Sequence, residues 1–206
     1  MKKGLCLAAV LLALALFGCA PKEAQMVLEK AQLDEREEKI AELLGADADQ
    51  LLYDFTLDDS VKSLQVNTYQ LVDGAWEMVS GGAQAFSDPK GRLALGFVNL
   101  AQGLRVALQS EAGTDASKYE TNQQEDYSGM ARATSSRSER TEIAYGQEIP
   151  LVLQVLTTQN AVSTYETDMF FEPQRYEAAG YEHVYAVTIT FFQEEVKEVK
   201  SSHAQP

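Results

Sequence analysis

Apolar and polar residues alternate through much of the chain after residue 50, a pattern typical of strands with one buried face. The alternation is clearest near the C-terminus, where one face of a predicted strand carries Tyr185, Val187, Ile189 and Phe191. The same period predicts strands around residues 128–136, 140–145 and 148–157. Residues 110–127 are polar and acidic and predict a loop, and no helical period is present after residue 50.

Four consecutive segments predict two hairpins. The segments 64–66 and 76–78 flank Asp73-Gly74, a dipeptide that favours a tight hairpin turn. The segments 93–97 and 104–108 form the second predicted pair. About eight or nine short strands with regular turns indicate a mainly β fold, an antiparallel β-sandwich of the immunoglobulin-like or jelly-roll-like kind. A closed β-barrel is the alternative.

One N-terminal helix is predicted over residues 23–44, which are rich in Ala, Leu, Glu and Lys. Gly45 suits its C-terminal end. The charged run 34–39 predicts a solvated helix face. An apolar stripe on the same helix consists of Leu33, Ile40, Leu43 and Leu44. The helix is expected either to pack on the β domain or to form a stalk.

The N-terminus has the pattern of a removable signal peptide, a basic pair followed by an apolar run too short to span a bilayer comfortably. The run ends in Leu16-Phe17-Gly18-Cys19, which resembles the lipobox of bacterial lipoproteins. The resemblance implies that Cys19 is diacylated and becomes the mature N-terminus, and two acyl chains give stable membrane anchoring. An ordinary secretory signal with a chance cysteine is the alternative.

The lipobox resemblance and the residue patterns together predict a division of the chain. Residues 1–18 are then the signal peptide, 19–45 the lipidated cysteine, a short tether and the helix, 46–195 the β-sandwich, and 196–206 a disordered tail. The expected location is extracytoplasmic, with the protein lipid-anchored to the bacterial cell membrane. In a bacterium with two membranes, the outer one is expected, because Ala20 stands where inner-membrane lipoproteins commonly carry Asp.

Two further stretches carry a wider resemblance. The stretches 53–64, YDFTLDDSVKSL, and 180–188, GYEHVYAVT, look like segments of uncharacterised surface lipoproteins of Gram-positive gut bacteria. This resemblance implies a β-rich domain outside the cell. It transfers no activity and no catalytic residue.

The chain is acidic, with a net charge of −14, and loss of the leader removes two lysines and no acids. This balance disfavours binding to nucleic acid, which requires clustered Lys and Arg. The cysteines are Cys6 and Cys19, so no disulfide is expected in the mature domain. The histidines are His183 and His203, which leave little material for a transition-metal site. We therefore expect no metal and no cofactor.

Acidic residues keep one catalytic class open, a hydrolase with paired carboxylates. Asp54, Asp58 and Asp59 lie around the first predicted strand, where a turn cap is the favoured interpretation. Asp47 and Asp49 begin like a calcium loop, but the Gly and Glu required at its sixth and twelfth positions are missing, which leaves open only a weak calcium site of loop carboxylates. No catalytic residue is therefore assigned.

Aromatic residues concentrate in residues 163–183 and just beyond, as Tyr165, Phe170, Phe171, Tyr176, Tyr181 and Tyr185. On exposed loops they would form a platform for a sugar or a peptide. The favoured hypothesis is structural: the phenylalanines plug one end of the sandwich and the tyrosines cover a strand edge. The ligand-binding residues stay unassigned.

These features favour a non-enzymatic binding or envelope-interaction module that is held at the membrane through Cys19. Its expected ligand is a glycan, a peptide or an envelope protein. The alternative is a carboxylate-dependent hydrolase of the cell envelope or of glycans.

Overall fold

A computed structural model describes residues 25–43, 50–121, 127–163 and 165–197. Several sequence-predicted features lie outside these ranges, namely the signal peptide, Cys19, the calcium-loop residues Asp47 and Asp49, and His203.

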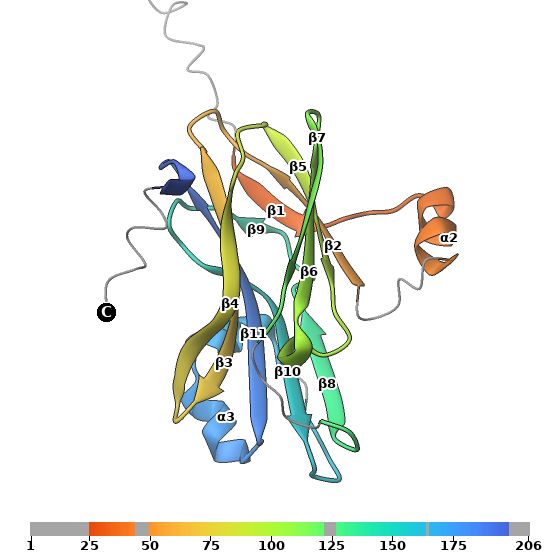
Figure 1. Cartoon of the computed structure of the whole chain (residues 1–206), viewed down its shortest axis with the longest axis vertical. Coiled ribbons are helices and arrows are strands. Elements are labelled where there is room, and N and C mark those ends of the chain that lie inside the picture. Colours follow the sequence, from red (N-terminus) through yellow and green to blue (C-terminus); the bar gives the residue numbers. More distant parts are fainter. Residues whose placement is uncertain (1–24, 44–49, 122–126, 164, 198–206) are drawn as a thin grey trace, which may run out of the picture.

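The described chain forms two antiparallel sheets that face each other, as the alternation predicts (Figure 1). The six-stranded sheet has the order β7-β6-β5-β2-β1-β9, and the five-stranded sheet has the order β4-β3-β11-β10-β8. The strands of the first are β1 Val27–Lys30, β2 Gln50–Thr56, β5 Lys90–Gly96, β6 Leu104–Ser110, β7 Gly113–Tyr119 and β9 Thr141–Glu142. Those of the second are β3 Ser63–Val72, β4 Ala75–Ala85, β8 Ala131–Ser136, β10 Ile149–Thr157 and β11 His183–Phe192. No strand of the described ranges belongs to both sheets, so the fold is a sandwich and the barrel alternative is wrong.

The inner faces of the two sheets form the main core. On β11 the inward residues are the predicted ones, and all four are fully buried: Tyr185, Val187, Ile189 and Phe191. Each such side chain contributes roughly 1.5–3 kcal/mol on burial. The hydroxyl of Tyr53, on β2, donates to the Leu151 carbonyl of β10 at 3.1 Å, so one hydrogen bond crosses the core between the sheets.

Both predicted hairpins are confirmed, one in each sheet. β3 and β4 are joined by Asp73 and Gly74, whose φ angles of 47° and 77° are the left-handed pair that a type I′ turn requires. β5 pairs with β6, and the short helix η2, Leu100–Gln102, lies in their connection. Alternation located β3, β5 and β6 because each has residues in the main core, whereas β4 has no buried residue and was located by the turn that precedes it.

Residues 27–30 form a strand, which the helix prediction missed. β1 pairs with both β2 and β9, and Leu28 is fully buried in the core. Helix propensity differs by less than about 1 kcal/mol per residue, and burial of Val27 and Leu28 outweighs it. The remaining helix, α2, spans Glu35–Leu43. The sandwich therefore includes residues that the sequence division placed before residue 46.

β7 lies within residues 110–127, where a loop was expected. It is the edge strand of its sheet, and its residues are polar and mostly exposed, so no alternation marks it in the sequence. Backbone pairing with β6 holds β7 in place. Gln84 of β4 donates to the Ser117 hydroxyl of β7 at 3.1 Å, which links the two sheets along this side of the sandwich.

Candidate functional site: a groove beside helix α2

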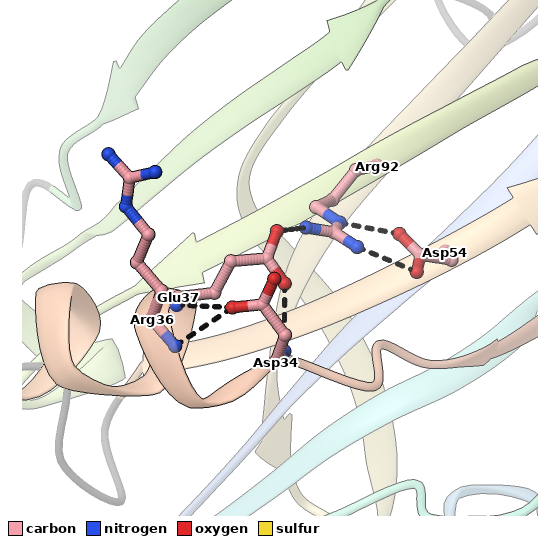
Figure 2. Close-up of polar contacts among 5 residues, drawn as sticks. All are labelled: Asp34, Arg36, Glu37, Asp54 and Arg92. Carbon is pink, nitrogen blue, oxygen red and sulfur yellow. Dashed lines mark hydrogen bonds and ion pairs between the residues drawn. The ribbon is translucent and has the colours of Figure 1, made fainter.

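Helix α2 begins with reciprocal hydrogen bonds between side chain and backbone (Figure 2). Oδ1 of Asp34 accepts from the backbone N–H of Arg36 at 2.9 Å and of Glu37 at 2.8 Å. Oε2 of Glu37 accepts from the backbone N–H of Asp34 at 3.0 Å. This capping box satisfies N–H groups that a helix start otherwise leaves open. The charged run 34–39 therefore forms the cap and the first turn of α2, and its residues are exposed, as the predicted solvated face requires.

Glu37 uses its other oxygen to hold α2 beside the six-stranded sheet. Arg92, on β5, donates from Nη1 to Oε1 of Glu37 at 3.2 Å. Its Nε and Nη2 donate to the two carboxylate oxygens of Asp54, on β2, at 2.6 and 3.0 Å. The hydrogen bonds to Asp54 raise the pKa of Arg92 above its ordinary value. Figure 2 shows this chain of contacts from helix to sheet, with the side chain of Arg36 pointing away from it.

A cavity of about 550 Å³ lies between α2 and the outer face of the six-stranded sheet, and we call it the α2 groove. The helix side is apolar and includes Leu33, Ile40 and Ala41. The sheet side includes Leu52, Ala94 and Gly96. The polar residues of the lining are Glu37, Arg92, Arg105 and Gln109. The groove exists because the outward residues of β5 become small after Arg92, while Leu93 and Leu95 point into the core.

No residue of α2 is buried. Ile40 is 49% exposed and Leu43 is 85% exposed. Helices in globular proteins gain most of their stability by burying an apolar face against the core. The apolar side of α2 instead borders an open cavity, and the helix is held by polar contacts at its first turn.

Arg105, on β6, is the cation in the lining that has no ion-pair partner among the described residues. The guanidinium of Arg92 is bound to Asp54 and Glu37. Lys118, which faces Arg105 in the β6–β7 register, binds Glu120 at 2.7 Å. Arg105 is exposed, so its charge is available to a ligand in the groove.

A second pocket, of about 720 Å³, is polar and lies beside the ends of β4 and β6. Three carboxylates contribute to its lining, those of Asp88, Asp115 and Glu195, together with Lys62. The ammonium of Lys62 donates to the Asp59 carbonyl at 3.1 Å. This pocket suits a polar ligand. Its acidic residues differ from Asp54, Asp58 and Asp59, the candidate carboxylates of the sequence analysis.

Two of the predicted candidate carboxylates have structural partners. Asp54 binds Arg92, as described above. Oδ1 of Asp58 accepts from the Ser60 N–H at 2.9 Å, which is the turn cap that the sequence favoured, and its Oδ2 accepts from the Tyr145 hydroxyl. His183, at the start of β11, packs edge-on against Tyr127, with ring centroids 5.2 Å apart.

The aromatic segment covers the outer face of the five-stranded sheet. It contains two short helices that the sequence did not predict, η3 Thr167–Phe171 and α3 Gln174–Ala179. Phe170 and Tyr176 from these helices join Leu153, Val155, Val184 and Ala186 of the sheet in a second core. Trp76 stacks on Phe170 at 5.1 Å and donates from Nε1 to the Phe170 carbonyl at 2.7 Å.

The hypothesis of Tyr176 as a recognition residue is therefore wrong, because its side chain is 1% exposed. Burial also raises the pKa of Tyr176. The segment has a structural role, as the favoured hypothesis expects. It covers the outer face of a sheet, however, and does not plug the end of the sandwich. Phe171, predicted as a plug, is 57% exposed, and Tyr185 belongs to the main core.

Part of the groove lining could be predicted from the sequence. Leu33 and Ile40 belong to the predicted apolar stripe, and the spacing Asp34-x-x-Glu37 could have marked the helix start. No sequence pattern marks Arg92, Gly96 or Arg105 as groove residues, because their place beside the helix follows from the order of the strands in the sheet.

Within the described ranges, no helix is long and apolar enough to cross a membrane. The same residues contain no group of three or more His, Cys, Asp or Glu placed to hold a metal ion. Comparisons of the chain with protein-family models, curated proteins and solved structures find no match.

Proposed function

We propose that this chain is an extracytoplasmic lipoprotein that is anchored to the bacterial membrane through Cys19 and binds a small apolar or amphiphilic ligand, without catalysis, in the α2 groove. The signal-peptide pattern and the lipobox residues support the location. The observation that carries the binding role is the apolar cavity of about 550 Å³. Its size falls within the range of roughly 300–1,000 Å³ that is usual for small-molecule sites.

The position of α2 supports a role beyond stability. The helix buries no residue, and it leaves Ile40 and Leu43 exposed. Exposed apolar surface beside a groove is typical of binding sites. A helix that only completed the fold would be expected to place these residues against the sheet.

The lipid anchor is tested by the change Cys19→Ala. We expect wild-type protein to incorporate an alkyne-tagged fatty acid during growth and to fractionate with membranes. The variant is expected to incorporate none and to accumulate as precursor or in the soluble fraction. Equal labelling of both proteins would contradict lipidation at this residue.

Groove binding is tested by filling the groove with a larger side chain. Gly96 suits this purpose, because a Cβ at this position would meet only Cβ of Arg105, at an ordinary 3.9 Å. In a soluble form of residues 20–206, Gly96→Leu is expected to abolish the fluorescence gain of the uncharged probe N-phenyl-1-naphthylamine. Ala131→Leu, at an exposed position of β8, is the matched control and should keep it. Equal fluorescence of all three proteins would exclude the groove as the site.

A carboxylate-dependent hydrolase is the second candidate, and the polar pocket with Asp88, Asp115 and Glu195 is the observation that favours it. In this case purified protein should cleave cell-envelope glycans, and Asp115→Asn should abolish the cleavage without a change in thermal stability. Activity that survives Asp88→Asn, Asp115→Asn and Glu195→Gln individually would remove this candidate.

A further inference from the structure

We propose that the α2 groove takes a free long-chain fatty acid, with the acyl chain lying in the groove and the carboxylate bound by Arg105. This inference rests on the proposed binding function and names its ligand class.

The inside of the groove matches an acyl chain. From Leu33 and Ile40 on the helix side to Ala94 and Gly96 on the sheet side, the side chains are hydrocarbon or absent. Against this apolar part of the lining, away from Glu37, Arg92, Arg105 and Gln109, a sugar or an extended peptide would place hydroxyl or amide groups without hydrogen-bond partners, which is unfavourable. A polymethylene chain has no such groups, so its burial is favourable along its whole length.

The rim supplies a matching charge. Arg105 has no ion-pair partner among the described residues, whereas Arg92 and Lys118 are both paired. A guanidinium binds a carboxylate through two parallel hydrogen bonds, so an anionic head group is the natural complement of Arg105. Glu37, the acid in the groove lining, has its charge paired with Arg92.

Gly96 leaves the way open between the groove and the guanidinium. It faces Arg105 directly in the β5–β6 register. A side chain at this position would start 3.9 Å from Cβ of Arg105 and would occupy the space between the groove and the head-group site. A chain that lies in the groove can therefore place its carboxylate at Arg105 without crossing another side chain of β5.

A single free fatty acid fits better than a bilayer surface. The cavity lies between a helix and a sheet and is bounded on both sides, which suits one chain. Clusters of Lys and Arg bind anionic lipid surfaces, whereas the described lining of the groove offers a single cation without an ion-pair partner, Arg105. The cation at the rim is thus expected to select a monomeric anion.

The test uses the full-length lipoprotein in isolated membranes, labelled by light with a palmitic-acid analogue that carries a diazirine. Crosslinks are expected on peptides that contain α2, β5 and β6. Arg105→Gln should reduce this labelling about tenfold or more, because a hydrogen-bonded charge is lost. Lys118→Gln, the matched loss of a cation on the neighbouring strand, should stay within about twofold of the wild type. Thermal unfolding of each variant checks that the fold is retained.

Competition separates the head group from the chain. Palmitic acid should compete at least about tenfold better than hexadecanol against wild-type protein, and equally well against Arg105→Gln. Within a series of saturated acids, each added methylene should tighten binding about twofold to fourfold until the groove is full.

The outcomes distinguish this inference from the function on which it rests. If Gly96→Leu abolishes labelling but Arg105→Gln does not change it, the groove binds apolar molecules without charge selection, and the fatty-acid inference is wrong. If neither variant changes labelling, or if crosslinks map only to the Cys19 peptide, the groove is not the site and both proposals are wrong.

Discussion

Arg92 links helix α2 to the six-stranded sheet through hydrogen bonds. Its guanidinium binds a carboxylate of the sheet through two hydrogen bonds and a carboxylate of the helix through one. The side chain of Arg92 is 28% exposed, so the pair with Asp54 is partly shielded from solvent, while Glu37 at 45% is less so. Exposed ion pairs contribute little, and the bidentate geometry makes this one more favourable than most.

Arg92→Gln is expected to lower the free energy of unfolding by about 1 kcal/mol and to speed hydrogen exchange in the first turn of α2. Urea unfolding and exchange mass spectrometry measure the two effects. Lys39→Gln removes the 3.9 Å pair with Glu35 on the exposed side of the same helix and should change neither quantity. Unchanged exchange in Arg92→Gln would show that α2 is held by something else.

Tyr176 separates the two possible roles of the aromatic segment. Its ring is buried against Tyr165, with centroids 4.9 Å apart, and its hydroxyl has no hydrogen-bond partner among the described residues. Tyr176→Ala is expected to cost about 3–5 kcal/mol in unfolding free energy, whereas Tyr176→Phe should be neutral or stabilising, because it removes an unsatisfied polar group. Phe171→Ala, at the exposed neighbour, should cost less than about 0.5 kcal/mol. A neutral Tyr176→Ala would contradict the second core.

At the scale of elements, Glu182 joins the end of β10 to the start of β11. Its carboxylate accepts from the Thr157 hydroxyl and from the hydroxyl and N–H of Thr158, the last at 3.1 Å. The hydrogen bonds from these threonine side chains lower the pKa of Glu182 to about 2, and the bond from Thr157 has the largest effect. A lowered folded-state pKa stabilises the fold above the unfolded pKa of about 4.3, and the contribution is lost as pH falls towards 2.

Wild-type protein is therefore expected to lose stability more steeply than Glu182→Gln between about pH 4.5 and 2. Above this window the variant should be the less stable of the two. Urea unfolding at a series of pH values gives both slopes. Glu166→Gln, at an exposed glutamate before η3 that makes no capping bond, should keep the wild-type slope. Parallel curves for wild type and Glu182→Gln would refute the assignment.

β1 allows a test of the element that the sequence misplaced. Leu28 is fully buried in the main core, so Leu28→Ala is expected to cost about 2–5 kcal/mol. If the predicted helix over residues 23–44 formed a stalk, the same change would cost almost nothing. Lys30→Ala, on the exposed end of β1, should stay within about 0.5 kcal/mol of wild type. Chemical denaturation measures both differences.

The strands that alternation found are those with one face in the core, such as β3, β5 and β11. β1 and β7 could not be found in this way. β1 is four residues long and lies in a helix-favouring composition, and β7 is an edge strand with almost no buried surface. In the groove, Leu33 and Ile40 were marked by their spacing. Arg105 was not, because its role depends on sheet order and on the absence of a side chain at Gly96.

At the scale of the whole molecule, the sandwich has unequal outer faces. The outer face of the five-stranded sheet is covered by η3 and α3, which form a second core on it. Among the described residues, α2 is the helix beside the outer face of the six-stranded sheet; it stands off to the side in Figure 1, and the groove between them is open. The first nineteen residues of the sequence predict a location, and the period-two alternation predicts the fold. No sequence pattern predicts the groove or the ligand that it would bind.

The two cores meet at β10, all nine residues of which are buried. Leu153 and Val155 belong to the second core, while Ile149, Leu151, Val152 and Leu156 belong to the main core. A replacement anywhere on this strand must fit one packed environment or the other, and nearly every position is constrained in volume. In a saturation scan scored by folding, β10 should accept the fewest substitutions and β7 among the most. Among homologues that have diverged, the sequence of β10 is then expected to stay similar for longest, while the residues around α2 are expected to vary with the ligand.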